Sequence, residues 1–258
     1  MEPARATRWD ARNAGKDGQL PPVAEEAPVT IVVNDREVAT LLCTPRDLLE
    51  MTVGWLYAER LIEDTTEILS LAGCANDRTM LVSTEPDRVG VAEGPARLIT
   101  SGCGAGANAA LWQADNIPRV TGGLHLPLPT VRVMVRAVLR ASRLYHLTGG
   151  VHTAALVDAE RVVVQKEDIG RHNAVDKVIG HALLNGLPLD ELALLATGRL
   201  SFEMAWKAAR AGIPIVASLS IPSAMARDVA EAAGLTLVSR ALSTRPWVYT
   251  HPERVRED

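Results

Sequence analysis

The sequence has few aromatic residues, few cysteines and few lysines. Aromatic residues make up 3% of the 258 residues, with a single Phe, so Val, Leu, Ile and Ala have to build the core. The three cysteines are widely spaced and odd in number, which argues against a disulfide framework and against a structural zinc site. Arginine carries nearly all of the positive charge, because lysine occurs only at Lys16, Lys166, Lys177 and Lys207.

The chain also has neither an excess of positive charge nor a long apolar run. Its 27 basic and 31 acidic residues give a net charge of −4. The chain therefore lacks the net positive charge that is typical of nucleic-acid-binding proteins. The most apolar stretch, 212–226, is interrupted by two prolines, whereas a membrane span needs about 20 apolar residues. Residues 1–22 lack the apolar segment of a signal peptide. We therefore expect a cytoplasmic protein without a nucleic-acid or membrane partner.

Composition and pattern divide the chain into three parts. Residues 1–24 are rich in Ala, Arg, Gly and Pro and are expected to form a flexible lead-in. A small α+β section is expected over 25–128, and an α/β domain over 129–258. A chain of this length is long enough for one large domain or two small ones.

The α+β section begins with a predicted β-hairpin. Apolar runs at 28–34 and 37–43 flank the turn residues Asp35 and Arg36. Thr44 is then expected to be the N-cap of a helix that runs to about residue 60, because a proline follows it at the first helical position. Two short strands are expected at 68–71 and 79–83.

The later part of the chain alternates between strand and helix patterns. A helix is expected over 130–147, where apolar residues recur at helical spacing before two glycines. Strands are then expected at 153–157, 161–165, 192–196, 213–217 and 235–239. Helices are expected at 172–184, 201–211 and 223–233. This alternation predicts an α/β fold with a three-layer α/β/α sheet that is mostly parallel in its later part.

Cys103 is the candidate nucleophile. It lies in a glycine-rich segment, residues 100–106, and a helix is predicted directly after it over 107–113. A helix N-terminus stabilises negative charge and lowers the pKa of a thiol from its usual value of about 8.5. The alternative is that this segment is a glycine-rich turn, in which Cys103 occurs only because its side chain is small and has no catalytic role. Cys43 and Cys74 are interpreted as structural thiols.

A second motif, residues 168–177, follows a predicted strand and opens a helix. Arg171, His172 and Asn173 at such a helix start form a candidate phosphate or anion site, and His172 could also act as a general base. The alternative is a surface ion pair between Arg171 and Asp176, with His172 and Asn173 as helix caps.

Two further glycine turns lie where strands meet helices or loops, at 148–152 and at 197–201, and the second of them contains Arg199. Ligands bind at the carboxyl ends of strands in open α/β sheets, so Arg199 joins the candidate anion-binding residues. The phosphate loop, the dinucleotide-binding turn and the nucleophile elbow are all absent from the sequence. The paired motifs of the zinc deaminases are absent as well.

Taken in order, these motifs resemble the FdhD/NarQ family of formate dehydrogenase accessory sulfurtransferases. The similarity covers nearly the whole chain, roughly residues 25–254. The matching segments lie at 26–34, 44–47, 53–56, 101–104, 148–152, 167–177, 197–203, 207–214 and 248–251.

The resemblance implies a cytidine-deaminase-like α/β/α fold without the zinc site, in a cytoplasmic protein that is usually a homodimer. It implies that Cys103 takes sulfur from a cysteine desulfurase as a persulfide. The sulfur then passes to the molybdenum (or tungsten) bis-pterin guanine dinucleotide cofactor, Mo-bis(MGD), which is afterwards inserted into the formate dehydrogenase apoenzyme. In this sequence Gly106 replaces the second cysteine of the family's C-G-x-C-G motif, so the loop has no second thiol for a relay.

The resemblance also assigns cofactor binding to a C-terminal segment made of Arg240, Ala241, Leu242, Ser243, Thr244 and Arg245. This segment leaves a predicted strand end, where α/β sheets place ligands. The planar guanidinium of Arg245 can donate two hydrogen bonds to a phosphate, and the hydroxyls of Ser243 and Thr244 can donate as well. The alternative is an exposed loop that carries two ordinary arginines.

Three functions follow from these motifs. The leading hypothesis is a sulfurtransferase that uses the single thiol of Cys103. The rival is a chaperone that binds and delivers the cofactor without transferring sulfur. A nucleotide deaminase is disfavoured, because the sequence offers no residues to hold a zinc ion.

Overall fold

The computed structural model describes residues 22–74, 78–85, 97–99 and 117–256. Cys103 and the helix expected over 107–113 lie outside the described residues. The proposed division of the chain at residues 24 and 128 stays a prediction.

A five-stranded sheet forms the N-terminal part of the protein, with strand order β3-β4-β1-β2-β5. Its strands are β1 (Ala27–Val33), β2 (Arg36–Cys43), β3 (Ile68–Cys74), β4 (Thr79–Thr84) and β5 (Arg97–Ile99). The expected hairpin is confirmed, since β1 and β2 pair in antiparallel fashion. Its turn lies one residue earlier than expected, at Asn34 and Asp35, whose φ angles of 46° and 62° suit the tight turns that match strand twist.

Helix α1 (Leu48–Ala58) follows β2 and packs its apolar residues on this sheet. The expectation that Thr44 is its N-cap was wrong, because the cap position is Asp47, in the left-handed region at φ 52°. Thr44 is unavailable as a cap: its N–H donates to Asp168, and its hydroxyl accepts from the N–H of Ile169. A contact far along the chain therefore overrides the local capping signal.

A six-stranded mixed sheet forms the C-terminal part, with strand order β12-β11-β10-β9-β7-β8. Its strands are β7 (His152–Val157), β8 (Val162–Asp168), β9 (Ala193–Ala196), β10 (Ile215–Ser218), β11 (Thr236–Ser239) and β12 (Trp247–Thr250). The parallel part that the alternation predicted consists of β9, β10 and β11. The strands β7, β8 and β12 pair with their neighbours in antiparallel fashion.

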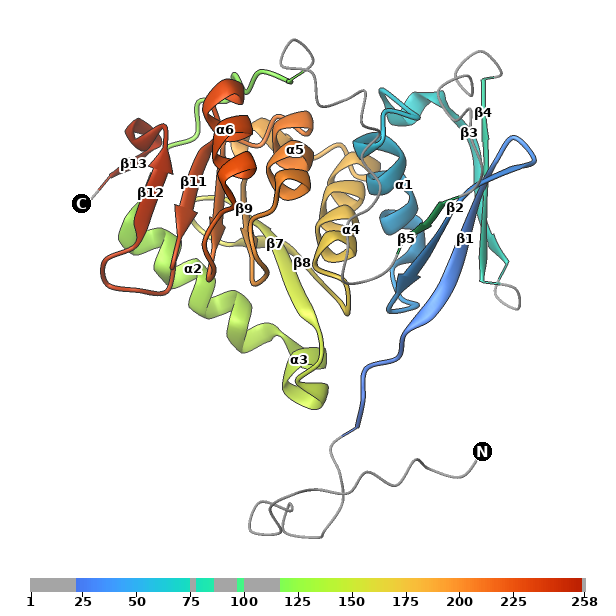
Figure 1. Cartoon of the computed structure of the whole chain (residues 1–258), viewed down its shortest axis with the longest axis horizontal. Helices are drawn as coiled ribbons and strands as arrows, with labels where there is room; N and C mark the ends of the chain where they lie inside the picture. Colours follow the sequence, from blue (N-terminus) through green and yellow to red (C-terminus); the bar gives the residue numbers. More distant parts are fainter. Residues whose placement is uncertain (1–21, 75–77, 86–96, 100–116, 257–258) are drawn as a thin grey trace, which may run out of the picture.

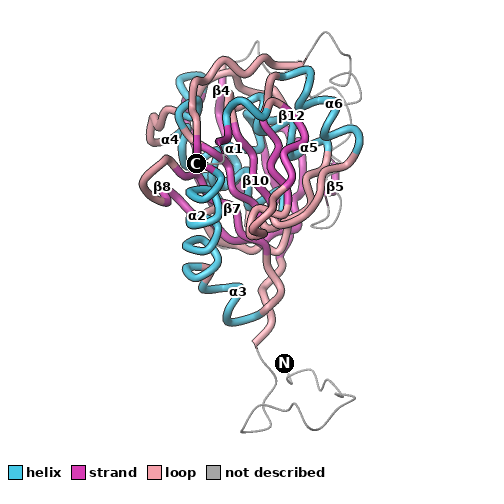
Figure 2. Tube along the Cα trace, turned by 90° about the vertical axis from the view of Figure 1, so that its left-hand side faces the viewer, coloured by secondary structure: helices cyan, strands magenta, loops and turns pink. Residues whose placement is uncertain are grey.

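Helices pack against both faces of this sheet (Figures 1 and 2). One face carries α4 (Arg171–Leu184), α5 (Phe202–Arg210) and α6 (Ala224–Ala233), and the other carries α2 (Leu128–Ala141). Along β7, Ala154 and Leu156 face the first layer, whereas Ala155 and Val157 face α2. The mixed α/β class is thus confirmed, and the likeness of its layering to cytidine deaminases stays a prediction.

The helix expected over 130–147 is two helices, α2 and α3 (Arg143–Thr148), separated at Ser142. Ser142 is fully buried and its hydroxyl donates to the carbonyl of Val138. The carboxylate of Glu167 accepts from the N–H groups of Leu144 and Tyr145 and so caps the first turn of α3. These contacts explain the break, which the sequence pattern did not reveal.

Helices α1 and α4 join the N-terminal and C-terminal parts by crossing at their backbones. A Cβ atom on Gly54 would lie 2.0 Å from the carbonyl oxygen of Asp176, and one on Gly180 would lie 1.8 Å from that of Glu50. Only glycine fits at either position.

Short elements complete the described chain. A two-stranded sheet pairs β6 (Leu126–Pro127) with β13 (Val255–Arg256), and 3₁₀ turns lie at Thr65–Glu67, Leu189–Glu191 and Pro252–Arg254. In the part of the chain that the structure describes, no helix has the length and apolar character needed to cross a bilayer.

Candidate functional site

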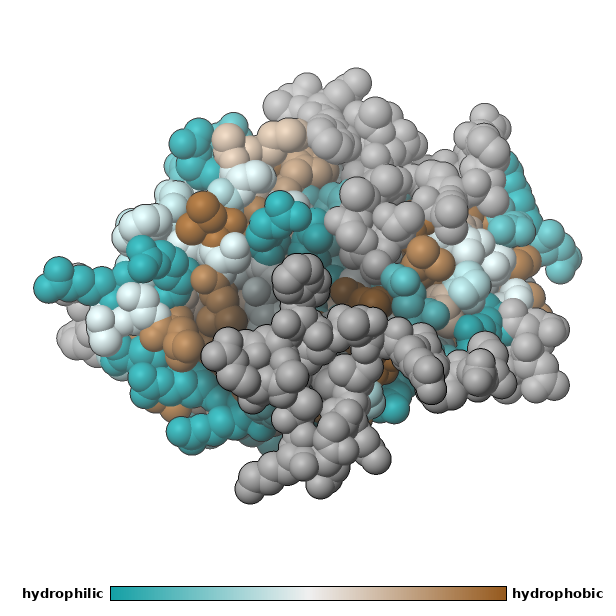
Figure 3. Space-filling view, turned by 60° about the horizontal axis from the view of Figure 1, so that its bottom comes forward, coloured by the Kyte–Doolittle hydropathy of each residue, from teal (hydrophilic) through white to brown (hydrophobic). Residues whose placement is uncertain are grey.

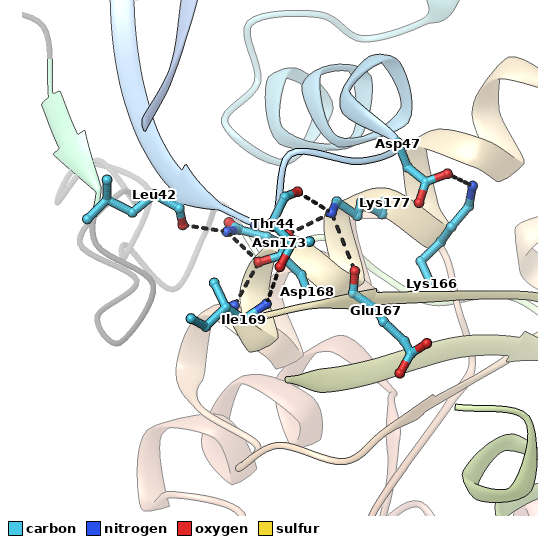
Figure 4. A network of polar contacts seen from close by, with 10 residues as sticks. Leu42, Thr44, Asp47, Lys166, Glu167, Asp168, Ile169, Asn173 and Lys177 are labelled. Carbon is cyan, nitrogen blue, oxygen red and sulfur yellow. Dashed lines mark hydrogen bonds and ion pairs between the residues drawn. The ribbon is translucent and has the colours of Figure 1, made fainter. Parts of the chain in front are cut away.

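The motif at 168–177 forms a buried polar junction between the N-terminal and C-terminal parts (Figure 4). Asp168 and Lys177 are both fully buried, and the Lys177 ammonium lies 2.6 Å from Oδ2 of Asp168. The same ammonium donates to the carbonyl of Thr44, and the N–H of Thr44 donates back to Asp168. The ion pair thus connects the end of β2 to the end of β8.

Asn173 belongs to this junction. Its side-chain amide donates to the carbonyl of Leu42, at 2.9 Å, and to Oδ1 of Asp168, at 3.1 Å. The side chain is buried, and both contacts are with protein groups. We therefore assign Asn173 to the junction rather than to an anion-binding surface.

A second buried network lies one turn further along α4. Both carboxylate oxygens of Asp176 accept from the Lys207 ammonium, at 2.6 and 2.5 Å. His172 is buried, with Nδ1 2.5 Å from a carboxylate oxygen of Glu203 and Nε2 3.3 Å from the hydroxyl of Ser201. Burial lowers the pKa of His172, against the opposing effect of the Glu203 carboxylate. Protein side chains thus engage both ring nitrogens.

The alternative interpretation of this motif, a surface ion pair between Arg171 and Asp176, was wrong. Asp176 is 1% exposed and pairs with Lys207. Burial raises the pKa of Asp176 to about 6, and the positive charge of Lys207 opposes that shift. A lysine 31 positions away is a partner that local spacing does not predict.

One edge of the six-stranded sheet collects the other predicted residues. The carboxyl ends of β9, β10 and β11 meet there because these strands are parallel. Antiparallel pairing brings the start of β7 and the end of β8 to the same edge, where His152 lies opposite Asp168. Arg171, Arg199 and Arg240 each follow one of these strand ends. We call this region the carboxyl edge. Figure 3, in which the lower side of Figure 1 comes forward, shows hydrophobic residues (brown) among hydrophilic ones (teal).

A pocket of about 450 Å³ opens at the carboxyl edge, and we call it the histidine pocket. Within it, Nδ1 of His152 lies 3.4 Å from the hydroxyl of Thr197, which also accepts from the N–H of Thr153. Burial lowers the pKa of His152, and the positive charges of Arg171 and Arg199 lower it further, against the charge of Asp168. The full lining is Leu139, Tyr145, Gly149, Gly150, Val151, His152, Thr153, Thr197 and Leu219.

A second pocket, of about 400 Å³, lies at the N-terminal end of α2, and we call it the arginine pocket. Arg245, Ser243 and Thr244 line it from the loop between β11 and β12, and Arg132 lines it from α2. Its remaining lining residues are Leu128, Pro129 and Pro246. The two guanidinium groups and two hydroxyls supply hydrogen-bond donors that suit a phosphate.

The first half of the C-terminal segment has a different environment. Arg240, at φ 51°, extends its guanidinium over the ring of Trp247, with Cζ 4.9 Å from the ring centroid. Ala241 is buried and its N–H donates to the carbonyl of Ser218 at the end of β10. Leu242 is exposed. Arg199, which follows β9 and lies outside this segment, is exposed as well. The segment is thus anchored at Ala241, and its second half forms the arginine pocket.

Cys43 has the properties of a structural thiol. It is fully buried, and desolvation together with the charge of Asp168 raises the pKa of its thiol to about 12. A buried thiol with so high a pKa is inert toward sulfur donors at neutral pH. The assignment of Cys43 as structural agrees with this geometry.

Two residues that line these pockets, Arg132 and His152, were not among the site residues predicted from the sequence. Arg132 is one of several arginines on an amphipathic helix, and nothing in its local sequence distinguishes it. His152 did carry a signal, since it ends one of the glycine turns that we placed at element junctions, but its pairing with Thr197 joins positions 45 residues apart.

Fold and site together define a mixed α/β protein, with a buried polar junction and two pockets at one edge of its larger sheet. A sequence model of the FdhD/NarQ family matches residues 24–256. The chain therefore belongs to the FdhD/NarQ family.

Relatives of known name and structure agree with this assignment. Sulfur carrier protein FdhD of Bacillus subtilis is 33% identical over 234 residues, covering 90% of this chain and 89% of the relative. The protein of the same name from Thermoplasma acidophilum is 36% identical over 256 residues, covering 95% and 90%. A crystal structure described as a formate dehydrogenase accessory protein, from Desulfotalea psychrophila, superimposes with a TM-score of 0.76 at 31% identity, covering 91% of this chain and 90% of that one.

Proposed function

We propose that the protein is a cytoplasmic sulfur carrier for formate dehydrogenase. Cys103 accepts sulfur from a cysteine desulfurase as a persulfide, and the protein transfers that sulfur to Mo-bis(MGD) before the cofactor enters the formate dehydrogenase apoenzyme. The names of the relatives support the general role. The cofactor is cargo in this proposal, and the carboxyl edge holds it.

The observation that carries the proposal is the pair of pockets at the carboxyl edge. The arginine pocket offers Arg132 and Arg245 to an anionic group, and the histidine pocket lies beside Arg171 and Arg199. Mo-bis(MGD) carries several negative charges, so it requires several basic contacts of this kind.

The chain that leads to Cys103 approaches the same edge. Strand β5 is parallel to β2, with Ile99 opposite Leu41, and the next residue, Leu42, contacts Asn173 at the start of α4. Cys103 follows Ile99 by four residues, a separation that a fully extended backbone spans in about 14 Å. This short separation from Ile99 supports Cys103 as the residue that delivers sulfur to the carboxyl edge.

Loading is a thiol–disulfide type exchange. The Cys103 thiolate attacks the outer sulfur of the desulfurase persulfide, and the sulfur–sulfur bond of the donor breaks. The cysteine of the donor leaves as a thiolate, and Cys103 then carries the persulfide. No net oxidation or reduction is needed, because the transferred sulfur keeps its oxidation state.

Intact mass spectrometry after incubation with a cysteine desulfurase and cysteine tests the loading step. Wild type, Cys43→Ala and Cys74→Ala should each gain about 32 Da, one sulfur atom, in a form that a reductant removes. Cys103→Ala should gain nothing. A wild-type protein that stays unloaded beside a relative that loads would contradict the sulfur-carrier proposal.

A cofactor chaperone is the second candidate, and Gly106 favours it. The residue stands where the family motif has a second cysteine, so this motif lacks a second thiol that could relay or protect a persulfide. A chaperone would bind Mo-bis(MGD) at the carboxyl edge with Cys103 unloaded.

A homodimer is part of the proposal, because a twofold assembly offers symmetric sites for the two dinucleotide arms of the cofactor. Light scattering at micromolar concentration, with and without cofactor, measures it. Monomer under both conditions would contradict the dimer.

A further inference from the structure

The two pockets at the carboxyl edge differ in chemistry. The arginine pocket presents two guanidinium groups and two hydroxyls, beside the first turn of α2. Apart from His152, Thr197 and Thr153, the histidine pocket is lined by apolar, aromatic or glycine residues. A diphosphate has many strongly hydrated oxygens and needs a donor for most of them, so the histidine pocket is a poor site for it.

The histidine pocket suits an anion whose charge is spread over soft atoms. The Thr197 hydroxyl accepts from the N–H of Thr153, and its own hydrogen can point to Nδ1 of His152, 3.4 Å away, which is the direction that we assign to this bond. In the neutral ring Nε2 then carries the proton and can donate to a ligand. The neighbouring positive charges of Arg171 and Arg199 add attraction for an anion, and together with burial they lower the pKa of the ring.

Helix α2 connects the two pockets. Arg132 lines one and Leu139 lines the other, and seven residues of helix separate them by about 10 Å along the axis. A second link is the hydrogen bond from the N–H of Ala241 to the carbonyl of Ser218, which holds the loop of the arginine pocket beside Leu219. A ligand with two different ends can therefore occupy both pockets at once.

We propose that the histidine pocket receives the metal–dithiolene end of the cofactor, with His152 donating from Nε2, while the arginine pocket receives a diphosphate. This inference rests on the proposed function and assigns the two ends of its cargo to different side chains. His152 is in this assignment a binding residue for the end of the cofactor that accepts sulfur, and Thr197 fixes its tautomer.

Calorimetric titration with two ligands, GDP and Mo-bis(MGD), tests the assignment. His152→Ala should weaken cofactor binding by about tenfold, the effect of one hydrogen bond to a charged group, and leave GDP binding within about twofold. Arg132→Ala should weaken the binding of both ligands. His125→Ala is the matched control, because His125 is exposed and bonds only to the nearby carbonyl of Gly123 among the described residues.

Two further measurements keep the test independent of folding. Thr197→Val should reproduce the cofactor-selective loss and Thr197→Ser should restore binding, since serine keeps the hydroxyl. In wild-type protein, the imidazole NMR signals of His152 should shift on addition of cofactor and stay in place on addition of GDP.

Three results would overturn the assignment. Equal losses for GDP and cofactor in His152→Ala would put the diphosphate in the histidine pocket, and unchanged affinity for both would leave that pocket unused. Wild-type protein that binds no cofactor would instead refute the proposed function, and the assignment with it.

Discussion

The buried junction and the carboxyl edge both derive from polar motifs, yet they use their charges in opposite ways. At the junction, Asp168, Lys177 and Asn173 bond to one another or to the backbone. At the edge, Arg199 and Arg245 are exposed. The comparison shows that a distinctive motif does not by itself indicate a ligand site. A motif whose polar atoms already bond to protein groups has a structural role, and a motif whose polar atoms remain exposed is available to a ligand.

The largest effect should come from breaking the junction. Lys177→Met leaves the Asp168 carboxylate buried without its cation, which should lower the free energy of unfolding by about 3–5 kcal/mol. Urea denaturation measures this change. Arg227→Ala removes an exposed ion pair with Asp228 and should leave stability unchanged. Equal stability of Lys177→Met and wild type would mean that the junction does not hold the two parts together.

At the carboxyl edge, Arg245→Ala should change binding and leave stability unaltered. Loss of a charge-assisted phosphate contact costs about 1.5–3 kcal/mol, so affinity for GDP should fall by roughly 10- to 150-fold while Cys103 still loads sulfur. Arg161→Ala, an exposed arginine in the turn between β7 and β8, is the calorimetric control. Unchanged affinity in a folded Arg245→Ala protein would remove this loop from the site.

Asn173→Ala sharpens the comparison, because Asn173 was a candidate anion-binding residue. Its loss leaves the carbonyl of Leu42 without this donor in a buried site, which should cost about 1–3 kcal/mol of stability. GDP affinity, measured where the protein is folded, should not change. Asn185→Ala, which removes an exposed contact with His181, serves as the control. A loss of GDP affinity in Asn173→Ala would return Asn173 to the binding surface.

The smallest effect is expected at Cys43. With a pKa of about 12 and no exposed surface, its thiol should resist iodoacetamide at pH 8 in the native protein and react in urea. Peptide mass mapping measures both states. Alkylation of Cys43 in the folded protein at the rate of Cys103 would show that burial does not protect it.

The sequence predicted those parts of the fold that depend on local pattern. The hairpin of β1 and β2 and the alternation from β9 to β11 follow from hydrophobic periodicity and turn residues. Contacts between distant residues escaped prediction. Thr44 does not cap α1, because its N–H bonds to Asp168, which lies 124 positions away. The buried Ser142 lies between α2 and α3, where the pattern predicted a single helix.

The site was predictable to a similar extent. That strand ends would gather basic residues follows from sheet topology, and Arg199, Arg240 and Arg245 do lie near such ends. The surroundings of each arginine were not predictable. The guanidinium of Arg240 lies over the ring of Trp247, whereas Arg245 lines a pocket together with Arg132. The chemistry of a site depends on such pairs, which are distant in sequence.

Transfer of sulfur from Cys103 to the cofactor is the central claim, and the mass of the loaded protein tests it most directly. Protein that carries the additional sulfur, about 32 Da, is mixed with GDP or with Mo-bis(MGD) in its reduced Mo(IV) state, without added thiol, and its intact mass is measured. The two electrons of Mo(IV) are needed to break the sulfur–sulfur bond, because the transferred sulfur becomes sulfide and Cys103 leaves as a thiolate. The proposal predicts that the added mass disappears with the cofactor and persists with GDP. If the cofactor binds and the added mass persists, the protein is a chaperone rather than a sulfur carrier.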